Sequence, residues 1–288
     1  NSWFDLHGEN ILRRSAEALK LIEKDPLCVE VMKAYAMGSS MEELRSRLEI
    51  NLHSPYTALR TCVFGMLQNY DGVWEGAVET LRPIADRGNS PYREFASYQM
   101  ALALEKMGDI EGTIAANRDA AKSSLSFIAG PAAFNLGVLL SKQGKFSEAE
   151  QAYRSAIESD HPDSAPAANY NLAALCIHTG NYPEAAARLE AAALSGHEEI
   201  APLAQYELGA LYANYGDSNR AIQQFTIVVA SKHPDVATVA ELDLGAEYAK
   251  LGRYSEARKC WENVVGSGYP KQAEMAKRNL NRLNKIIE

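Results

Sequence analysis

Apolar positions recur along the chain with a long, constant period. Large apolar residues stand 36 residues apart, at Phe64, Met100, Leu136, Leu172, Leu208 and Leu244. Eight residues after each of them comes a glycine: Gly72, Gly108, Gly144, Gly180, Gly216 and Gly252. The spacing within a unit is helical, and glycine tolerates the positive φ that ends one helix before the next begins. Each unit therefore predicts a helix, a short turn and a second helix.

Small and bulky residues also share this period. Directly after each large apolar residue stands a small one: Gly65, Ala101, Gly137, Ala173, Gly209 and Gly245. Nine residues after each turn glycine stand Leu81, Asn117, Tyr153, Leu189, Phe225 and Trp261. The small residues let the two helices approach closely, while the bulky residue of the second helix fills the space beside them. One such unit cannot bury its apolar faces alone, so the units must stack.

This pattern resembles the tetratricopeptide repeat (TPR) family, which places Leu-Gly in the first helix, Gly in the turn, then Ala and an aromatic residue in the second helix. The unit with Leu136-Gly137, Gly144, Ala149 and Tyr153 matches nearly throughout, and the resemblance covers about Thr57 to Glu288. The usual TPR period is about 34 residues. The loops here are two residues longer, and units of this length also occur in Sel1-like relatives. The resemblance implies an all-α fold, a right-handed α-solenoid of helix-turn-helix repeats forming a TPR-like superhelix.

Three segments follow from the lattice. Residues 1–56 are an N-terminal helical segment with helical patterns at 10–24, 27–37 and 41–48, and Gly38 is a candidate for the turn of a degenerate repeat. Residues 57–270 are six TPR-like repeats. Residues 271–288 form a C-terminal capping helix with a solvated outer face, because cations surround its apolar positions. The first helices are extended by further alanines at the same period, including Ala96, Ala132, Ala168, Ala204, Ala240 and Ala276.

Composition and charge narrow the class of protein. The chain has 288 residues, 47% of them hydrophobic, and 29 basic against 37 acidic side chains give a net charge of −8. Because no run of eighteen apolar residues occurs, we expect no membrane insertion. The chain starts at Asn1 rather than at Met and lacks a signal stretch, so we expect a processed or excised fragment with a cytoplasmic location.

Nucleic-acid binding is not favoured by this charge. A helix-turn-helix over 36–44 is an alternative for the N-terminal segment. The helix that would then read DNA, Pro55 to Met66, carries only Arg60 as a cation, whereas phosphate and base contacts need several.

Known catalytic and metal-binding motifs are missing from the sequence. Cys28, Cys62, Cys176 and Cys260 lie far apart, which favours reduced, buried thiols. His161, His197 and His233 repeat at the period of the units, but equivalent positions of stacked units are about 10 Å apart, too far to share one ion. We interpret them as loop and capping residues. We predict a protein with no enzymatic activity, no metal and no cofactor.

A second apolar face predicts a ligand groove. Tyr98, Phe134, Tyr170 and Tyr206 stand ten residues before successive turn glycines, roughly opposite the core leucines on a helical wheel. In the TPR family this face lines a concave groove that binds extended or helical peptides. The alternative is that the rings only pack against the next unit's first helix.

Polar residues stand beside these rings, nine before the glycines. Gln99, Asn135 and Asn171 offer amides that both donate and accept, so they suit the main chain of an extended peptide. Glu207 and Asp243 favour a basic ligand segment by complementary potential. The alternative is that all five are ordinary solvated helix residues.

These observations predict a non-enzymatic TPR module that binds a protein or peptide and acts as an adaptor or scaffold. One alternative is a ligand- or peptide-sensing regulatory domain of a larger signalling or transcription-regulating protein. Another is a homo-oligomeric scaffold whose grooves or caps bind each other.

Overall fold

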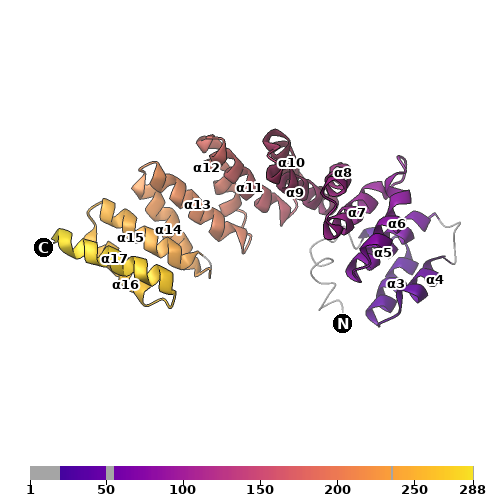
Figure 1. Cartoon of the computed structure of the whole chain (residues 1–288), viewed down its shortest axis with the longest axis horizontal. Helices are drawn as coiled ribbons and strands as arrows, with labels where there is room; N and C mark the ends of the chain where they lie inside the picture. The colour runs from indigo at the N-terminus through magenta and orange to yellow at the C-terminus, as the bar shows by residue number, and fades with distance from the viewer. Residues whose placement is uncertain (1–19, 50–54, 235, 288) are drawn as a thin grey trace. The chain divides into compact units, whose positions relative to one another are not determined.

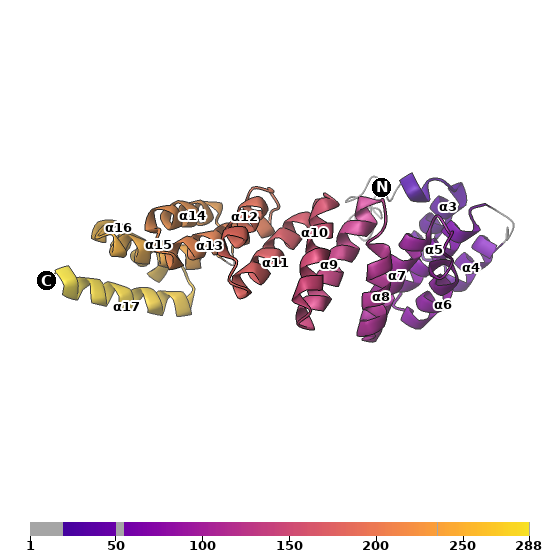
Figure 2. The ribbon, with the colours of Figure 1, turned by 90° about the horizontal axis from the view of Figure 1, so that it is seen from above.

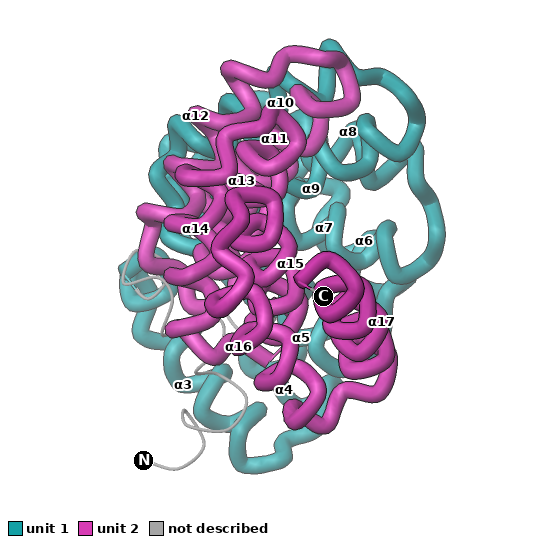
Figure 3. Tube along the Cα trace, turned by 90° about the vertical axis from the view of Figure 1, so that its left-hand side faces the viewer, with its two compact units in different colours: residues 1–165 teal, residues 166–288 magenta. Residues whose placement is uncertain are grey.

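The structure is built from helices joined by short turns, as predicted (Figure 1). The computed structural model describes residues 20–49, 55–234 and 236–287, and no strand occurs within these ranges. The fold is an all-α solenoid of helix-turn-helix repeats. The chain forms two compact units, residues 1–165 and residues 166–288 (Figure 3). Most of the helix predicted over 10–24 lies outside the described residues.

Each helix of the first unit from α3 to α10 packs against the next one along the chain (Figure 2). The helices of this unit are α3 (Pro26–Ala36), α4 (Met41–Glu49), α5 (Thr57–Tyr70), α6 (Trp74–Ala85), α7 (Arg93–Met107), α8 (Ile110–Ala120), α9 (Ser126–Lys142) and α10 (Phe146–Glu158). The predicted helices at 27–37 and 41–48 are therefore present as α3 and α4. Gly38 joins them with a φ of +87°.

The second unit continues the same pattern. Its helices are α11 (Ser164–His178), which begins at the boundary between the units, α12 (Tyr182–Ala193), α13 (Ile200–Asn214), α14 (Ser218–Ser231), α15 (Ala237–Lys250), α16 (Tyr254–Val265) and α17 (Pro270–Ile287). From α12 onward each helix packs against its successor.

The six turn glycines all have positive φ, between +71° and +78°. Gly108 shows what this conformation does. It caps α7 by donating its N–H to the Glu105 carbonyl at 3.1 Å, and the next N–H, of Asp109, donates to Leu104 at 3.0 Å. The Asp109 carboxylate then accepts the Gly112 N–H at 2.9 Å at the start of α8. One short segment thus ends the first helix and caps the second.

The predicted pairing of small and bulky residues forms the core of each repeat. The bulky residues nine after the turn glycines are at most 4% exposed. A Cβ added at Gly137 would lie 2.6 Å from ring atoms of Tyr153, and one at Gly245 would lie 2.5 Å from Trp261. Only a glycine lets these rings reach the first helix. The six alanines predicted to extend this seam are all fully buried.

The long loops between repeats are ordered turns built around a serine. At Ser159, Ser195, Ser231 and Ser267 the hydroxyl donates to the carbonyl three residues earlier, at 2.6–2.7 Å. It also accepts the N–H two residues later, at 3.2–3.4 Å. The residue between has a left-handed φ, and it is Asp160, Gly196, Lys232 or Gly268.

A buried ion pair connects the N-terminal hairpin, formed by α3 and α4, to the first repeat, formed by α5 and α6. Asp25 caps α3 by accepting the Leu27 N–H at 3.2 Å. Its carboxylate also accepts from Arg60 of α5, at 2.5 Å from Nε and 3.2 Å from a terminal nitrogen. Burial alone would raise the pKa of Asp25, but the hydrogen bonds from Arg60 and Leu27 hold it below its ordinary value. The cation considered for DNA reading therefore lies inside the protein.

Helix α17 is the last helix of the second unit within the described residues. It packs against α16 and α15 through its buried side chains, Ala276 and Leu283. Its cations Lys277, Arg278, Arg282 and Lys285 are all exposed. In the part of the chain that the structure describes, no helix is both long enough and apolar enough to cross a membrane.

Candidate functional site

In the first unit, the two predicted groove rings pack partly within their own scaffold. The Phe134 ring of α9 lies 6.2 Å from the Tyr153 ring of α10, and both Phe134 and Tyr98 are half-buried. Burial, with a smaller effect of Glu105, raises the pKa of Tyr98 to about 12. These rings contact the core and also expose part of their surface.

The two amides beside these rings differ in their surroundings. Gln99 is buried, and both its side-chain and main-chain oxygens accept from the Asn69 amide of α5, at 3.4 and 2.8 Å. Asn135 is half-buried, and its side chain makes no hydrogen bond within the described residues. The side chain of Gln99 is thus engaged by the preceding repeat, while that of Asn135 is open to a ligand or water.

In the second unit, Tyr206 joins the first helices of adjacent repeats. Its ring lies 5.7 Å from Phe225 of the same repeat, and its hydroxyl donates to Asp243 of α15 at 2.9 Å. Burial, and then the charge of Asp243, raise the pKa of Tyr206 above its ordinary value. Tyr170, on α11, is also half-buried.

The two predicted carboxylates of this unit have different partners. Asp243 accepts from Tyr206, and Lys250 lies seven residues further along α15, where it pairs with Glu247. Burial raises the pKa of Asp243, while the Tyr206 hydrogen bond and the charge of Lys250 oppose that effect. Glu207 has neither: Asn214 stands at the position equivalent to Lys250, and the Glu207 carboxylate makes no hydrogen bond or ion pair among the described residues. Burial raises the pKa of Glu207 above its ordinary value.

Glu207 lines a hollow of about 460 Å³ in the second unit. One wall is the face of α13 that carries Glu207, Ala210, Leu211 and Asn214, and the hollow is also lined by Ile177 of α11 and by Tyr182 and Tyr215. The rings of Tyr182 and Tyr215 meet edge to face, with centroids 5.2 Å apart and planes at 71°. They are 41% and 57% exposed, so their outer surfaces face solvent.

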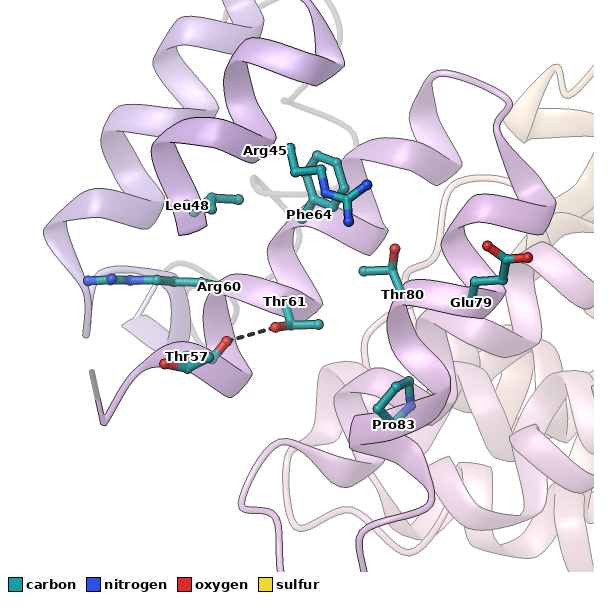
Figure 4. Close-up of a pocket in the computed structure, with 9 residues that line it drawn as sticks. All are labelled: Arg45, Leu48, Thr57, Arg60, Thr61, Phe64, Glu79, Thr80 and Pro83. Atoms are coloured by element: carbon teal, nitrogen blue, oxygen red, sulfur yellow. Dashed lines mark hydrogen bonds between the residues drawn. The ribbon is translucent and has the colours of Figure 1, made fainter. Parts of the chain in front are cut away.

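A smaller hollow, of about 280 Å³, lies in the first unit between α4, α5 and α6 (Figure 4). Arg45, Phe64 and Thr80 are among its lining residues, and the Thr61 hydroxyl donates to the Thr57 carbonyl at 2.9 Å. The guanidinium of Arg60 points away from the other side chains shown, toward Asp25. Although Arg60 lines this hollow, its charged group does not point into it.

Two of the periodic histidines act as helix caps. Nδ1 of His161 accepts the Ser164 N–H at 3.2 Å, and Nδ1 of His197 accepts the Ile200 N–H at 3.2 Å. Among the described residues no group of three or more His, Cys, Asp or Glu side chains is arranged to hold a metal ion. The four cysteines are buried and unpaired by disulfides, as predicted.

The repeat geometry agrees with a match to a known family. The tetratricopeptide repeat family model matches residues 134–202, which begin in α9 and include the Gly137–Tyr153 pair. Residues 134–202 therefore contain tetratricopeptide repeats. TPR repeats are in general a protein-interaction fold without catalytic activity of their own. A search of curated protein sequences finds no match.

Several solved structures have the same fold as this chain. The C-terminal part of a TPR repeat-containing protein from Cytophaga hutchinsonii has 18% identity and a TM-score of 0.61, over 79% of this chain and 89% of that one. YrrB, described as a TPR protein with an unusual peptide-binding site, has 17% identity and a TM-score of 0.52, over 72% and 97%. MamA has 20% identity and a TM-score of 0.51, over 64% and 95%.

The sequence analysis did not predict several residues that line the hollow beside Glu207. Tyr182 and Tyr215 stand two after one turn glycine and one before the next. Exposed apolar residues at the first of these positions recur in other repeats, as Ile110, Phe146 and Tyr254. That recurrence was the available signal, although it does not show that rings from two repeats meet.

Proposed function

We propose that this protein is a non-catalytic binding module that holds a protein or peptide segment on the first helices of repeats within a unit, as an adaptor or scaffold. The supporting observation is the condition of three polar side chains. Asn135, Asn171 and Glu207 are half-buried on first helices and have no hydrogen-bond partner among the described residues. Gln99 and Asp243, at equivalent positions, are bonded within the protein. Partly desolvated polar groups gain most from a ligand that completes their hydrogen bonds.

The chemistry of these groups favours an extended segment with a basic residue. An amide side chain donates and accepts together, which matches the alternating groups of a peptide backbone. Glu207 and Asp243 add negative potential to a chain whose net charge is −8. The peptide-binding site named for YrrB adds support, because it belongs to a protein of the same fold.

Peptide display tests this function. A library of short random peptides is selected on the full chain, and enriched peptides are measured by calorimetry against an Asn135→Ala, Asn171→Ala double variant. We expect the variant to bind about tenfold more weakly, since each lost backbone contact is worth about 0.5–1.5 kcal/mol. The matched control is Gln151→Ala with Gln223→Ala, which removes two exposed amides from second helices.

Two results contradict the proposal. One is that no peptide is enriched above the background of the display. The other is that enriched peptides bind the Asn135→Ala, Asn171→Ala variant as tightly as they bind the control.

A further inference from the structure

The hollow beside Glu207 combines one carboxylate with an aromatic edge and an apolar wall. Glu207 and Asn214 supply the hydrogen-bonding groups, while Ile177, Ala210 and Leu211 supply the apolar surface. A volume of about 460 Å³ falls within the usual range of roughly 300–1,000 Å³ for ligand pockets. It therefore accommodates a long side chain together with part of the main chain that carries it.

The charge of Glu207 is the unusual feature of this hollow. Side chains on the surrounding elements that face it are the phenols of Tyr170, Tyr182, Tyr206 and Tyr215, together with Asn214. None of these described side chains is cationic. In the next repeat the corresponding carboxylate, Asp243, accepts from a hydroxyl and also senses the charge of Lys250, a lysine that pairs with Glu247. A partly buried carboxylate with no cation nearby is a site where an incoming cation gains more than it would at an exposed one.

The aromatic edge discriminates between kinds of cation. Tyr182 and Tyr215 present ring surface to solvent beside the carboxylate. A guanidinium stacks on aromatic rings and offers five donors in one plane, whereas an ammonium is a compact and strongly hydrated charge. Elsewhere in the same unit the protein itself places Arg253 over the Tyr248 ring, at 4.4 Å.

We propose that this hollow is a pocket for a single arginine side chain of a bound protein segment. The guanidinium pairs with the Glu207 carboxylate, donates to the Asn214 side-chain oxygen and stacks against Tyr182 or Tyr215. The aliphatic part of the arginine lies on the apolar wall. This inference rests on the proposed peptide-binding function and adds to it a specific side chain and a specific pocket.

The test uses short synthetic peptides of glycine and serine with one central residue: arginine, lysine or citrulline, which is a neutral isostere of arginine. Each is titrated into the isotopically labelled full chain, and backbone amide shifts of Glu207, Ala210 and Asn214 are followed by NMR. We expect the arginine peptide to bind with a dissociation constant of about 1 mM. The lysine peptide should bind several-fold more weakly and the citrulline peptide at least about tenfold more weakly.

Variants assign the effect to the pocket. Glu207→Gln should weaken the arginine peptide by about tenfold and leave the citrulline peptide unchanged, because only the charge is removed. Tyr215→Leu keeps the apolar surface and should cost about threefold. Glu190→Gln, which removes an exposed carboxylate from α12, serves as the charge-matched control and should change neither affinity.

Three results would overturn the pocket. The first is no shift at the three amides with about 10 mM arginine peptide, a concentration that would populate even a site of that weak affinity. The second is equal binding of arginine and citrulline. The third is a set of shifts confined to the neighbourhood of Asn171. In that last case the pocket is wrong but the proposed peptide-binding function stands. The function itself fails if the display selection enriches no peptide.

Discussion

The contact between Gly137 and Tyr153 makes a quantitative prediction about how the repeats hold together. An alanine at 137 would place its Cβ 2.6 Å from the Tyr153 ring, whereas ordinary contact begins at 3.4 Å, so the ring must move by about 0.8 Å. Tyr153 is only 2% exposed and packs against Phe134, which leaves it little room. Such overpacking costs about 1–3 kcal/mol, and the better helix propensity of alanine returns about 1 kcal/mol. We expect Gly137→Ala to lower the free energy of unfolding by about 1 kcal/mol.

A second background isolates the cause. Another repeat of the chain already uses the smaller pair Ala173 and Leu189. In a Tyr153→Leu variant, Gly137→Ala should therefore be neutral or stabilising, which corresponds to a coupling energy of about 1–2 kcal/mol between the two positions. Urea denaturation followed by far-UV circular dichroism gives the four free energies, and hydrogen exchange in α9 and α10 locates the loss. If Gly137→Ala costs as much in the Tyr153→Leu background as it does beside the natural tyrosine, the steric explanation is wrong.

Three further predictions concern other parts of the chain. Lys232→Gly should raise the free energy of unfolding, measured by urea denaturation, by about 0.5–1 kcal/mol, because it removes a side chain from a left-handed position with φ of +56°. Gly196→Ala, at the equivalent position of another loop, should lower it by about 1 kcal/mol. Equal effects of the two substitutions would contradict this explanation. Arg60→Met should lower the free energy of unfolding by about 3–5 kcal/mol at neutral pH, because it leaves the buried Asp25 carboxylate unpaired. The loss should be smaller in acid, since the stability due to the lowered pKa of Asp25 disappears as pH falls through that pKa. A loss that does not change with pH would refute the pairing. Glu207→Gln should raise the melting temperature slightly at neutral pH, because it removes a partly buried charge. This gain should shrink as pH falls through the raised pKa of Glu207, where the carboxyl group becomes neutral. A lower melting temperature at neutral pH would contradict the prediction.

Much of the fold was predictable because repetition multiplies weak signals. A single Gly108 would indicate only a turn, but six glycines on one lattice predict the same left-handed conformation at each, and all six have it. The buried alanines and the Gly137–Tyr153 contact followed for the same reason. Residues at equivalent positions share a backbone environment, so one physical argument applied to every repeat.

Features that depend on two different repeats were harder to predict. Asp25 and Arg60 stand 35 residues apart and belong to a segment with no clear period, so nothing in the sequence paired them. Gln99 and Asn135 are equivalent in the lattice, yet Gln99 is bonded to Asn69 of the preceding repeat. The predicted groove set of Tyr98, Gln99, Phe134, Asn135, Tyr170, Asn171, Tyr206, Glu207 and Asp243 remains a prediction.

A second left-handed position recurs in the loops between repeats, but at two of its four occurrences the residue is not glycine. The serine loops have a left-handed residue that is glycine at Gly196 and Gly268, but Asp160 and Lys232 occupy it elsewhere. A search for repeated glycines does not find a conformation that two different residue types adopt. The serine hydroxyls one residue earlier are the better marker, because they bond the carbonyl and the N–H on either side of it.

The serine loops also determine where the chain can be recombined. A junction within the loop after Ser159 keeps Gly137 and Tyr153 in the same donor, so a transplanted block brings its matched pair of residues with it. A junction at the turn glycine Gly144 separates them, and joining an alanine from one parent sequence to a tyrosine from another creates a clash. Duplication and shuffling of such repeats are therefore tolerated at the loops between hairpins and penalised at the turns within them.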